Sequence, residues 1–324
     1  MKIIPVTHSS FPRIGENPEE QRLRRAFASL EEGKITETEF NQIQDQSVDE
    51  VVSIQEAAGM EIVTDGLVRW YDPASHLARN LKGFEINGLL RFFDTNFYYR
   101  QPVATNGVAE RNGDLAKEIE YAAAKSSKEI KAVILGPLSL AMMSLNKSSL
   151  KFDDFCLRLG DVLGRIITSL SATGVKVIQI EEPCLVRNPE HFELFKASYG
   201  RMVRNRQNAR VVLTTYFGDA TKIYDYFGEL PADMIGIDFT YSRGLLDKIA
   251  TDGFSKLIAF GILDGRNTKM ESPEDSAKML EKALKKIGGN EYHITTSCGL
   301  EFLPKKYAIK KLELTARVAR LLNG

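Results

Sequence analysis

The stretch "GVKVIQIEEP" at residues 174–183 decides the fold, because an apolar run ends there in two acids and a proline. Short runs rich in β-branched residues are typical of strands buried on both faces of a parallel sheet. Seven further runs of this kind occur: "KIIPV" near residue 3, "MEIVT" near 60, "KAVIL" near 131, "RVVLTT" near 210, "MIGID" near 234, "KLIAFGIL" near 256 and "YHITT" near 292. We therefore expect eight buried parallel strands.

Amphipathic stretches lie between several of these runs, at 151–172, 189–206, 272–287 and 304–323. Their apolar residues recur at helical spacing, as in "IKKLELTARVARLL" near the end of the chain. Eight strands that alternate with helices predict an α/β fold, a single (β/α)8 TIM barrel. No low-complexity tract, linker or short repeat marks a boundary, so one domain is expected over residues 1–324.

The charge balance narrows the class of partner. The 43 basic and 43 acidic side chains cancel, so no broad positive field attracts nucleic acid or an acidic membrane surface. No apolar run approaches the roughly 20 residues that a membrane span needs. The three cysteines form no CxxC pair, which suits a reducing compartment. We expect a cytoplasmic protein with a small-molecule substrate and neither a nucleic-acid nor a membrane partner.

Polar residues follow nearly every expected strand, where a (β/α)8 barrel carries its reactive groups. They are His8, Ser9, Asp65, Glu181, Glu182, Tyr216, Asp238, Asp264, Ser297 and Cys298. Several carboxylates on one rim would repel each other without a ligand, a cation or shared protons, so a functional mouth is expected. The alternative is that Asp and Ser end these strands for backbone reasons alone.

Glu181 and Glu182 are adjacent at the end of a strand, so their side chains point to opposite sides. One is expected to face a ligand, as a base or as the partner of a substrate ammonium, while the other holds the next loop. A purely structural carboxylate that caps the next turn is the alternative. Together with Asp264, these two acids are the candidate catalytic residues.

Other familiar chemistry has no motif here. The sequence contains neither GxGxxG after a strand, nor GxxxxGK[ST], nor GxSxG, so dinucleotide, nucleoside-triphosphate and serine-hydrolase chemistry are not expected. Cys298 could bind a metal or attack an electrophile, or it could be a small buried hydrophobic residue. Arg22, Arg24 and Arg25 on an early helix could hold a polyanionic tail, or they could form a solvated face balanced by glutamates.

Several longer strings carry a family resemblance. They are "SSFPRIG" at 9–15, "WYD" at 70–72, "FFDTNFYYRQP" at 92–102, "LGPLS" at 135–139, "GVKVIQIEEP" at 174–183, "TTYFGD" at 214–219, "GILDGRN" at 261–267 and "TSCGL" at 296–300. In this order, over nearly the whole chain, they resemble cobalamin-independent methionine synthase. That family carries two homologous barrels, and "FPRIG", "FDTNFYY", "TTYFGD" and "DGRN" are similar to its non-catalytic amino-terminal barrel.

The resemblance also implies what this chain lacks. In the family's catalytic barrel, a zinc held by His, Cys, Glu and Cys binds homocysteine as its thiolate. By resemblance, these ligand positions fall here at Thr214, Tyr216, Asp238 and Cys298. One thiol and one shortened carboxylate are too few for a tight site, so no zinc or other tightly bound cofactor is expected. Arg266 falls at the position of the family's proton-donating histidine, a further departure.

The resemblance also implies roles in substrate binding for two other sets of residues. Glu181 stands where the catalytic barrel has an Asp that holds the homocysteine amino group, and Arg22 and Arg24 lie in the stretch that helps to hold the folate polyglutamate tail. The candidate substrate-binding residues are therefore His8, Ser9, Ser10, Arg22, Arg24, Asp65, Tyr216, Asp238, Arg266 and Cys298.

The implied function is methyl transfer to homocysteine from a methylated pterin or folate, or from a corrinoid. The chain would serve it as a stand-alone amino-terminal-type half, beside a separately encoded zinc-bearing barrel or as a homodimer. The alternatives are an independent metal-free enzyme and a non-catalytic structural subunit. Seven aromatic residues predict an apolar contact surface at the rim, unless they line the mouth instead: Trp70, Tyr71, Phe97, Tyr98, Tyr99, Tyr216 and Phe217.

Overall fold

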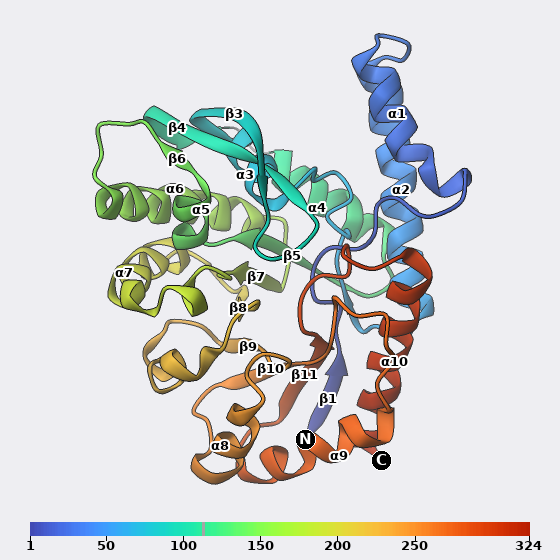
Figure 1. Ribbon diagram of the computed structural model, residues 1–324, viewed down its shortest axis with the longest axis vertical. Helices are drawn as coiled ribbons and strands as arrows, with labels where there is room; N and C mark the ends of the chain where they lie inside the picture. Colours follow the sequence, from blue (N-terminus) through green and yellow to red (C-terminus); the bar gives the residue numbers. More distant parts are fainter. Residues whose placement is uncertain (112–113) are drawn as a thin grey trace.

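The structure is a computed structural model that describes residues 1–111 and 114–324. Eight parallel strands form one sheet in the order β1-β11-β10-β9-β8-β7-β5-β2. A parallel bridge between Val6 and Ile62 joins the two ends of this order, so the sheet closes (Figure 1). The strands are β1 (Lys2–Pro5), β2 (Ile62–Val63), β5 (Glu129–Leu135), β7 (Val177–Glu181), β8 (Arg210–Thr215), β9 (Met234–Asp238), β10 (Leu257–Leu263) and β11 (Glu291–Thr296). All eight coincide with the apolar runs, and the predicted (β/α)8 barrel is confirmed.

Helices surround this barrel and cover its outer face (Figure 1). The four predicted amphipathic stretches are confirmed as α6 (Phe152–Ala172), α7 (Phe192–Val203), α9 (Pro273–Lys286) and α10 (Lys305–Asn323). In α6, Phe155, Leu159, Val162 and Ile166 recur every three or four residues and are all buried, which is why this sequence forms a helix against the sheet. The remaining helices of the layer are α3 (Pro73–Arg79), α4 (Asp114–Lys125), α5 (Pro137–Met143) and α8 (Gly244–Asp252), with 3-10 turns η2 (Leu185–Arg187), η3 (Pro189–His191) and η4 (Ala220–Glu229).

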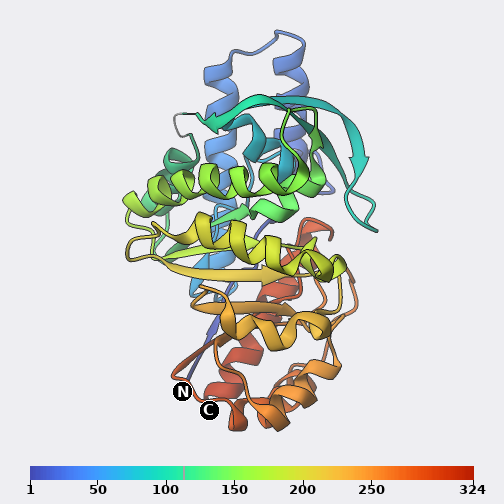
Figure 2. The same ribbon diagram turned by 90° about the vertical axis from the view of Figure 1, so that its left-hand side faces the viewer.

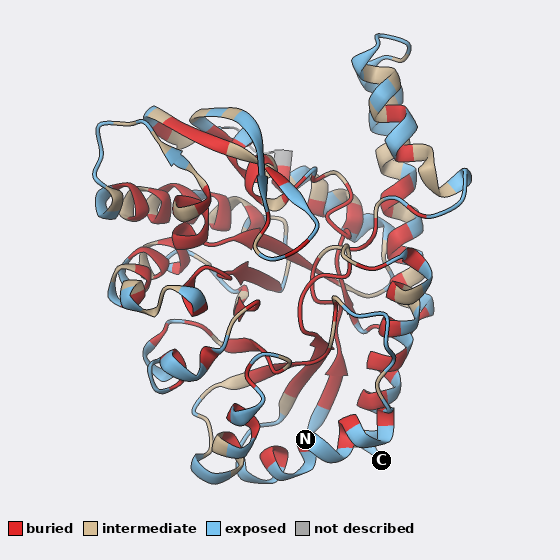
Figure 3. Ribbon diagram, in the orientation of Figure 1, coloured by how far each residue is buried: buried red, intermediate tan, exposed pale blue. Residues whose placement is uncertain are grey.

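A helical hairpin projects from one side of the barrel, at the upper right of Figure 1. It consists of the turn η1 (Glu19–Gln21), α1 (Arg22–Glu31) and α2 (Glu37–Ala57). A capping box begins α2, in which the Thr36 side chain accepts from the Glu39 N–H and the Glu39 carboxylate accepts from the Thr36 N–H. The outer part of the hairpin is largely exposed, whereas the lower part of α2 is buried against the barrel (Figure 3).

A second, three-stranded sheet stands apart from the barrel and was not predicted. Its antiparallel strands β3 (Leu81–Arg91) and β4 (Tyr98–Glu110) form a long ribbon, and the short β6 (Leu145–Asn146) pairs with β4. Figure 2 shows the ribbon running beside α6, where the Arg158 Nε–H donates to the Val108 carbonyl at 2.9 Å. Among the described residues, no helix is both long and apolar enough to cross a membrane.

Candidate functional site

The loops at the carboxyl ends of the barrel strands enclose a cavity of about 60 Å³, which we call the mouth cavity. Its walls are mostly aromatic, and two glutamates, Glu181 and Glu301, face into it. The aromatic lining comprises Phe11, Trp70, Tyr71, Phe92, Phe97, Tyr98, Tyr99, Tyr216 and Phe302. Segments far apart in the chain therefore meet at the end of the barrel where this fold carries its reactive groups.

Glu181 is the acid at the end of β7 that faces this cavity. Its carboxylate accepts from the Tyr216 hydroxyl at 2.8 Å and from the Gln179 amide at 3.1 Å, and the His8 Nδ1 lies 3.5 Å away. Burial raises the pKa of the Glu181 carboxyl, and the hydrogen bond from Tyr216 acts in the opposite direction. Glu181 is thus a buried acid in the wall of the mouth cavity, with a raised pKa.

Glu182 points the other way and holds the next loop. Its carboxylate accepts from the Leu138 N–H at 3.0 Å, the Ser139 N–H at 2.8 Å and the Ser139 hydroxyl at 2.6 Å, all at the start of α5. Gly136 is required beside it, because a Cβ there would overlap the carboxylate. Burial raises the pKa of Glu182 to about 7. The predicted division of this pair is therefore seen in the geometry, while a catalytic role for either acid stays a prediction.

Glu301, after β11, was missed from the sequence. Its carboxylate accepts from the Ser10 hydroxyl, and burial raises its pKa to about 7. Arg13, also missed, donates to the Trp70 and Tyr71 carbonyls and lines the same cavity. Arg13 lies inside the motif "SSFPRIG", and Glu301 directly follows "TSCGL". Their positions in the loops after β1 and β11 are therefore the sequence feature that could have identified them.

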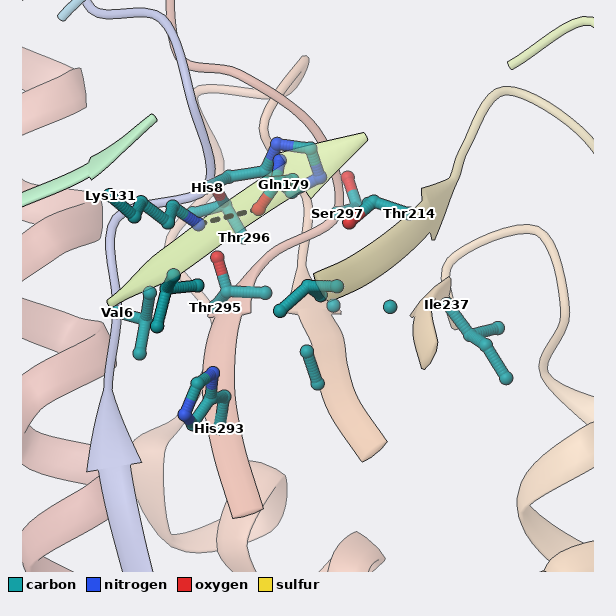
Figure 4. Close-up of a pocket in the computed structure, with 15 residues that line it drawn as sticks. Val6, His8, Lys131, Gln179, Thr214, Ile237, His293, Thr295, Thr296 and Ser297 are labelled. Atoms are coloured by element: carbon teal, nitrogen blue, oxygen red, sulfur yellow. Dashed lines mark hydrogen bonds between the residues drawn. The ribbon is translucent and has the colours of Figure 1, made fainter. Parts of the chain in front are cut away.

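The barrel interior below the mouth is polar (Figure 4). Lys131, on β5, is buried there, and its Nζ donates to the Gln179 Oε1 at 2.5 Å. Burial lowers the pKa of Lys131 to about 7, although the charge of Glu181 acts against this. A cavity of about 10 Å³ beside it is lined by His8, Thr214 and Thr295, whose Nε2, Oγ1 and Oγ1 atoms have no partner among the described residues. This space suits about one water molecule.

Of the four positions that correspond to zinc ligands, Tyr216 lines the mouth cavity and Thr214 lines the space below it, and the atoms at these positions do not suit the metal. The Tyr216 hydroxyl donates to Glu181, and the Asp238 carboxylate accepts from the Thr240 hydroxyl at 2.6 Å and from the Phe217 N–H at 3.3 Å. Burial, with the charges of Glu301 and Asp238, keeps the pKa of the Cys298 thiol well above its usual value, which opposes the thiolate that zinc needs. Among residues 1–111 and 114–324, no three His, Cys, Asp or Glu side chains could together hold a metal ion.

The turn between β3 and β4 lies across the mouth. Its tip residue Asp94 contacts Arg187, Tyr241 and Arg266, from the loops after β7, β9 and β10, at 3.2, 3.3 and 3.4 Å. The Phe97 ring packs against Phe302 with centroids 5.0 Å apart. This turn therefore covers the cavity and is fastened on three sides, and Arg266 belongs to that fastening.

The other predicted site residues are divided between the mouth and its surroundings. His8 and Ser9 lie together after β1, with 3.0 Å between Nδ1 and Oγ. Burial raises the pKa of Asp65 to about 6, and its carboxylate accepts from the Leu67 N–H. Asp264 accepts from the Arg266 N–H at 2.8 Å within its own loop.

Arg22 and Arg24 lie on the projecting hairpin, away from the mouth. The Arg22 guanidinium is 3.5 Å from the Glu50 carboxylate, and Arg24 is exposed. Their predicted role in binding an anionic tail stays a prediction.

The seven aromatic residues expected at the rim are divided between buried and exposed positions. Trp70, Tyr99, Tyr216 and Phe217 are buried, because they pack around the mouth cavity and the ribbon turn. Six of the seven line the mouth cavity, as the alternative had it: Trp70, Tyr71, Phe97, Tyr98, Tyr99 and Tyr216. Tyr71, Phe97 and Tyr98 remain exposed.

Proteins of known family resemble this chain over most of its length. Residues 74–288 match the family described as "Cobalamin-independent synthase, N-terminal domain". The chain is 29% identical over 301 residues to a methionine synthase of Saccharolobus solfataricus, which covers 92% of this chain and 90% of that protein. It is 28% identical over 303 residues to a methionine synthase of Sulfolobus acidocaldarius, covering 92% and 88%.

Solved structures show the same fold. A B12-independent methionine synthase from Shewanella sp. W3-18-1, in complex with selenomethionine, superimposes with a TM-score of 0.83 at 17% identity, over 100% of this chain and 98% of that one. A putative vitamin-B12 independent methionine synthase from Listeria monocytogenes gives a TM-score of 0.75 at 14% identity, over 100% of each chain.

Fold and mouth define a single closed (β/α)8 barrel with acids and aromatic side chains at its carboxyl end. The family match spans more than half of the chain, so the chain belongs to the cobalamin-independent methionine synthase family. Within that family, it matches the amino-terminal domain.

Proposed function

We propose that this chain serves methyl transfer to homocysteine as an amino-terminal-type barrel that binds the methyl donor and works beside a separate zinc-bearing barrel. The observation that carries the proposal is that residues at the family's zinc-ligand positions bind other groups of this chain. The Tyr216 hydroxyl donates to the Glu181 carboxylate, and the Asp238 carboxylate accepts from the Thr240 hydroxyl in its own loop. Family membership and the methionine synthases among its relatives support the reaction class.

The donor we propose is a methylated pterin or folate. Aromatic walls suit a flat ring, because such rings stack favourably on one another. At about 60 Å³ the mouth cavity is smaller than such a molecule, so only the methyl-bearing end would enter. Glu181 and Glu301 would meet that end and could hold or deliver a proton there. A corrinoid donor is the competing choice, and direct binding measurements with each donor distinguish them.

A donor-binding barrel needs a second site that activates the homocysteine thiol. We propose that this site lies on a separate zinc-bearing barrel, or that a second copy of the chain covers the mouth. Exposed apolar residues beside the mouth support a contact there, namely Leu89, Leu90, Phe97 and Tyr98 on the ribbon. Light scattering of the chain alone and of its mixture with the zinc-bearing barrel should reveal an assembly with a contact above roughly 1,000 Å².

The test of this function is methionine formation in three preparations: the chain alone, the zinc-bearing barrel from the same source alone, and their mixture. The proposal expects the mixture to exceed the sum of the two separate rates. A mixture that only adds the separate rates would defeat it.

A stand-alone enzyme is the second candidate, and one observation favours it. The chain covers 90% of the Saccharolobus solfataricus methionine synthase, so that named protein is itself about the length of one barrel. On this alternative, Glu181, Glu182, Asp238, Asp264 and Cys298 would perform metal-free chemistry, and the chain alone would form methionine at the full rate. A purely structural subunit would instead bind the zinc-bearing barrel but bind no donor.

A further inference from the structure

One carboxylate at the rim of the mouth is shared by three side chains from the barrel loops. Asp94, at the tip of the ribbon turn, lies 3.2 Å from the Arg187 guanidinium and 3.4 Å from that of Arg266. Its second oxygen lies 3.3 Å from the Tyr241 hydroxyl. Arg187, Tyr241 and Arg266 follow β7, β9 and β10, whereas Asp94 belongs to the separate ribbon. The barrel therefore presents a cationic cluster that a carboxylate from another part of the chain occupies.

Contacts within the barrel hold both arginines without Asp94. The Arg187 Nε–H donates to the Phe217 carbonyl at 2.8 Å, and the Arg266 Nη1–H donates to the Tyr241 hydroxyl at 2.7 Å. The Arg266 guanidinium also lies over the Phe217 ring, 4.9 Å from its centroid. Both hydrogen bonds are shorter than the contacts with Asp94, and shorter hydrogen bonds of this kind are the stronger ones. We therefore expect the cluster to keep its shape when Asp94 leaves.

Asp94 is the weakly held member of this cluster. Its side chain is 50% exposed, and exposed ion pairs contribute little to stability because water and salt screen them. Phe93, directly before it, has a φ of +51°, in the left-handed region that bulky side chains rarely adopt. Such strain persists only while neighbouring contacts impose it, and it is common in ligand clamps and switch segments. Asp94 can therefore leave the arginines at a small cost in free energy.

The cluster adjoins the mouth cavity. Phe92, beside the ribbon tip, lines the cavity and packs against the Phe217 ring with centroids 6.1 Å apart. The Arg266 guanidinium covers that same ring. Within residues 1–111 and 114–324, Asp94 is the only carboxylate that pairs with Arg187 or Arg266. When it leaves, two positive charges beside the cavity lose their counter-charge.

We propose that Arg187 and Arg266 form a carboxylate-binding site at the rim of the mouth, which Asp94 occupies in the empty protein and from which the carboxylate of a small ligand displaces it. A carboxylate is the expected chemistry because the group found there is a carboxylate, and guanidinium groups match its two oxygens. The Tyr241 hydroxyl supplies a further donor. The proposal rests on the proposed function only in that the mouth takes a ligand, and the reaction does not enter.

The sign of one substitution separates this proposal from a purely structural role of Asp94. Asp94→Asn keeps the size of the side chain but removes its charge, and with it the internal competitor. Arg187→Gln with Arg266→Gln removes the site. The matched control is Asp161→Asn, which removes the charge of a similarly exposed aspartate on α6 that pairs with Arg201 at 2.9 Å.

Two probes of equal shape isolate the carboxylate. Phenylpropionate carries an aromatic ring for the mouth and a carboxylate on a short flexible arm, and phenylpropanamide carries an uncharged amide instead. Trp70 is the single tryptophan of the chain and lines the mouth cavity, so its fluorescence reports binding. Calorimetry measures the same affinities independently, and thermal unfolding of each variant verifies that all fold alike.

We expect the wild type to bind phenylpropionate more tightly than the amide. Asp94→Asn should bind the carboxylate about threefold or more tightly than the wild type, because no internal group masks the binding-competent state. The double arginine variant should lose about tenfold in affinity for the carboxylate and keep its affinity for the amide. Asp161→Asn should bind both probes like the wild type.

Four results would overturn the proposal: no binding of either probe, equal binding of the two probes by the wild type, unchanged or weaker binding of the carboxylate by Asp94→Asn, or equal losses for both probes in the double arginine variant. None of them depends on methionine formation. If the probes behave as expected and no preparation forms methionine, the carboxylate site stands and the proposed function falls. If methionine forms in the mixture but Asp94→Asn does not tighten binding, the proposed function stands and the carboxylate site falls.

Discussion

The mouth cavity and an open groove of about 710 Å³ between the α1–α2 hairpin and helices α3 and α4 share Arg13 and Tyr71, yet the two spaces differ in charge. In the mouth the acids are buried, and hydrogen bonds from this chain hold each carboxylate. In the groove the cations are mostly exposed, and two of them have no partner among the described residues. Desolvation therefore governs the mouth, which should respond to pH, whereas screening governs the groove, which should respond to salt.

The largest effect should come from Glu182→Ala. The change leaves the buried Leu138 and Ser139 N–H groups without their acceptor, and each orphaned donor costs about 1–3 kcal/mol. We expect a loss of about 3 kcal/mol or more in the free energy of unfolding, measured by urea denaturation. Glu229→Ala, which removes an exposed partner of Lys196, is the control and should cost under about 1 kcal/mol. Equal losses would show that Glu182 does not hold the loop.

An intermediate effect is expected from Asp65→Asn, and it should depend on pH. Burial, with the nearby charge of Glu118, raises the pKa of Asp65 from 3.8 to about 6. A raised pKa means that the folded state keeps a proton which the unfolded state releases, so wild-type stability falls as pH rises from about 4 to about 6. The variant lacks this loss. Its free energy of unfolding, relative to that of the wild type, should therefore rise by about 2–3 kcal/mol between pH 4 and pH 7.

Urea denaturation at both pH values measures this difference. Glu313→Gln, an exposed change on α10, is the control. A stability difference between wild type and Asp65→Asn that stays constant with pH would mean that burial does not raise the pKa of Asp65.

The smallest effect is expected from Asp94→Ala, at the tip of the ribbon turn. Its ion pairs with Arg187 and Arg266 are exposed, so the loss of stability should stay below about 1 kcal/mol. Amide hydrogen exchange at residues 92–97 should nevertheless accelerate, because the turn loses contacts to three barrel loops. Asp161→Ala breaks the exposed pair with Arg201 and should leave that exchange unchanged. Unchanged exchange in Asp94→Ala would show that the aromatic packing alone fastens the turn.

The barrel could be predicted because its strands are short apolar runs that end in polar residues, a pattern that burial on both faces imposes. The β3–β4 ribbon could not, since β3 after Leu81 is exposed or half-buried without a regular alternation and carries glycines and charges, as in "KGFEING". Lys131 was hidden for a related reason. A lysine at the start of "KAVIL" reads as a strand flank, and only barrel closure turns its side chain inward.

The part of the site that could be predicted consists of residues directly at the ends of the strands. Glu181 and Glu182 follow β7 directly, and their division follows from strand geometry alone. Glu301, Arg13 and Asp94 belong to longer loops, whose course depends on tertiary contacts. The groove between the hairpin and helices α3 and α4 could not be predicted, because side chains from α1, α2, α3 and α4 line it together.

We propose that the mouth satisfies its acids with this chain's own donors and that it holds no zinc. Metal analysis of the protein, purified without chelator, tests it most directly. We expect far less than one zinc per chain, because Tyr216 and Asp238 are engaged elsewhere and burial raises the pKa of the Cys298 thiol, which opposes the thiolate that zinc needs. One tightly held zinc per chain would contradict the account and make the mouth a metal centre.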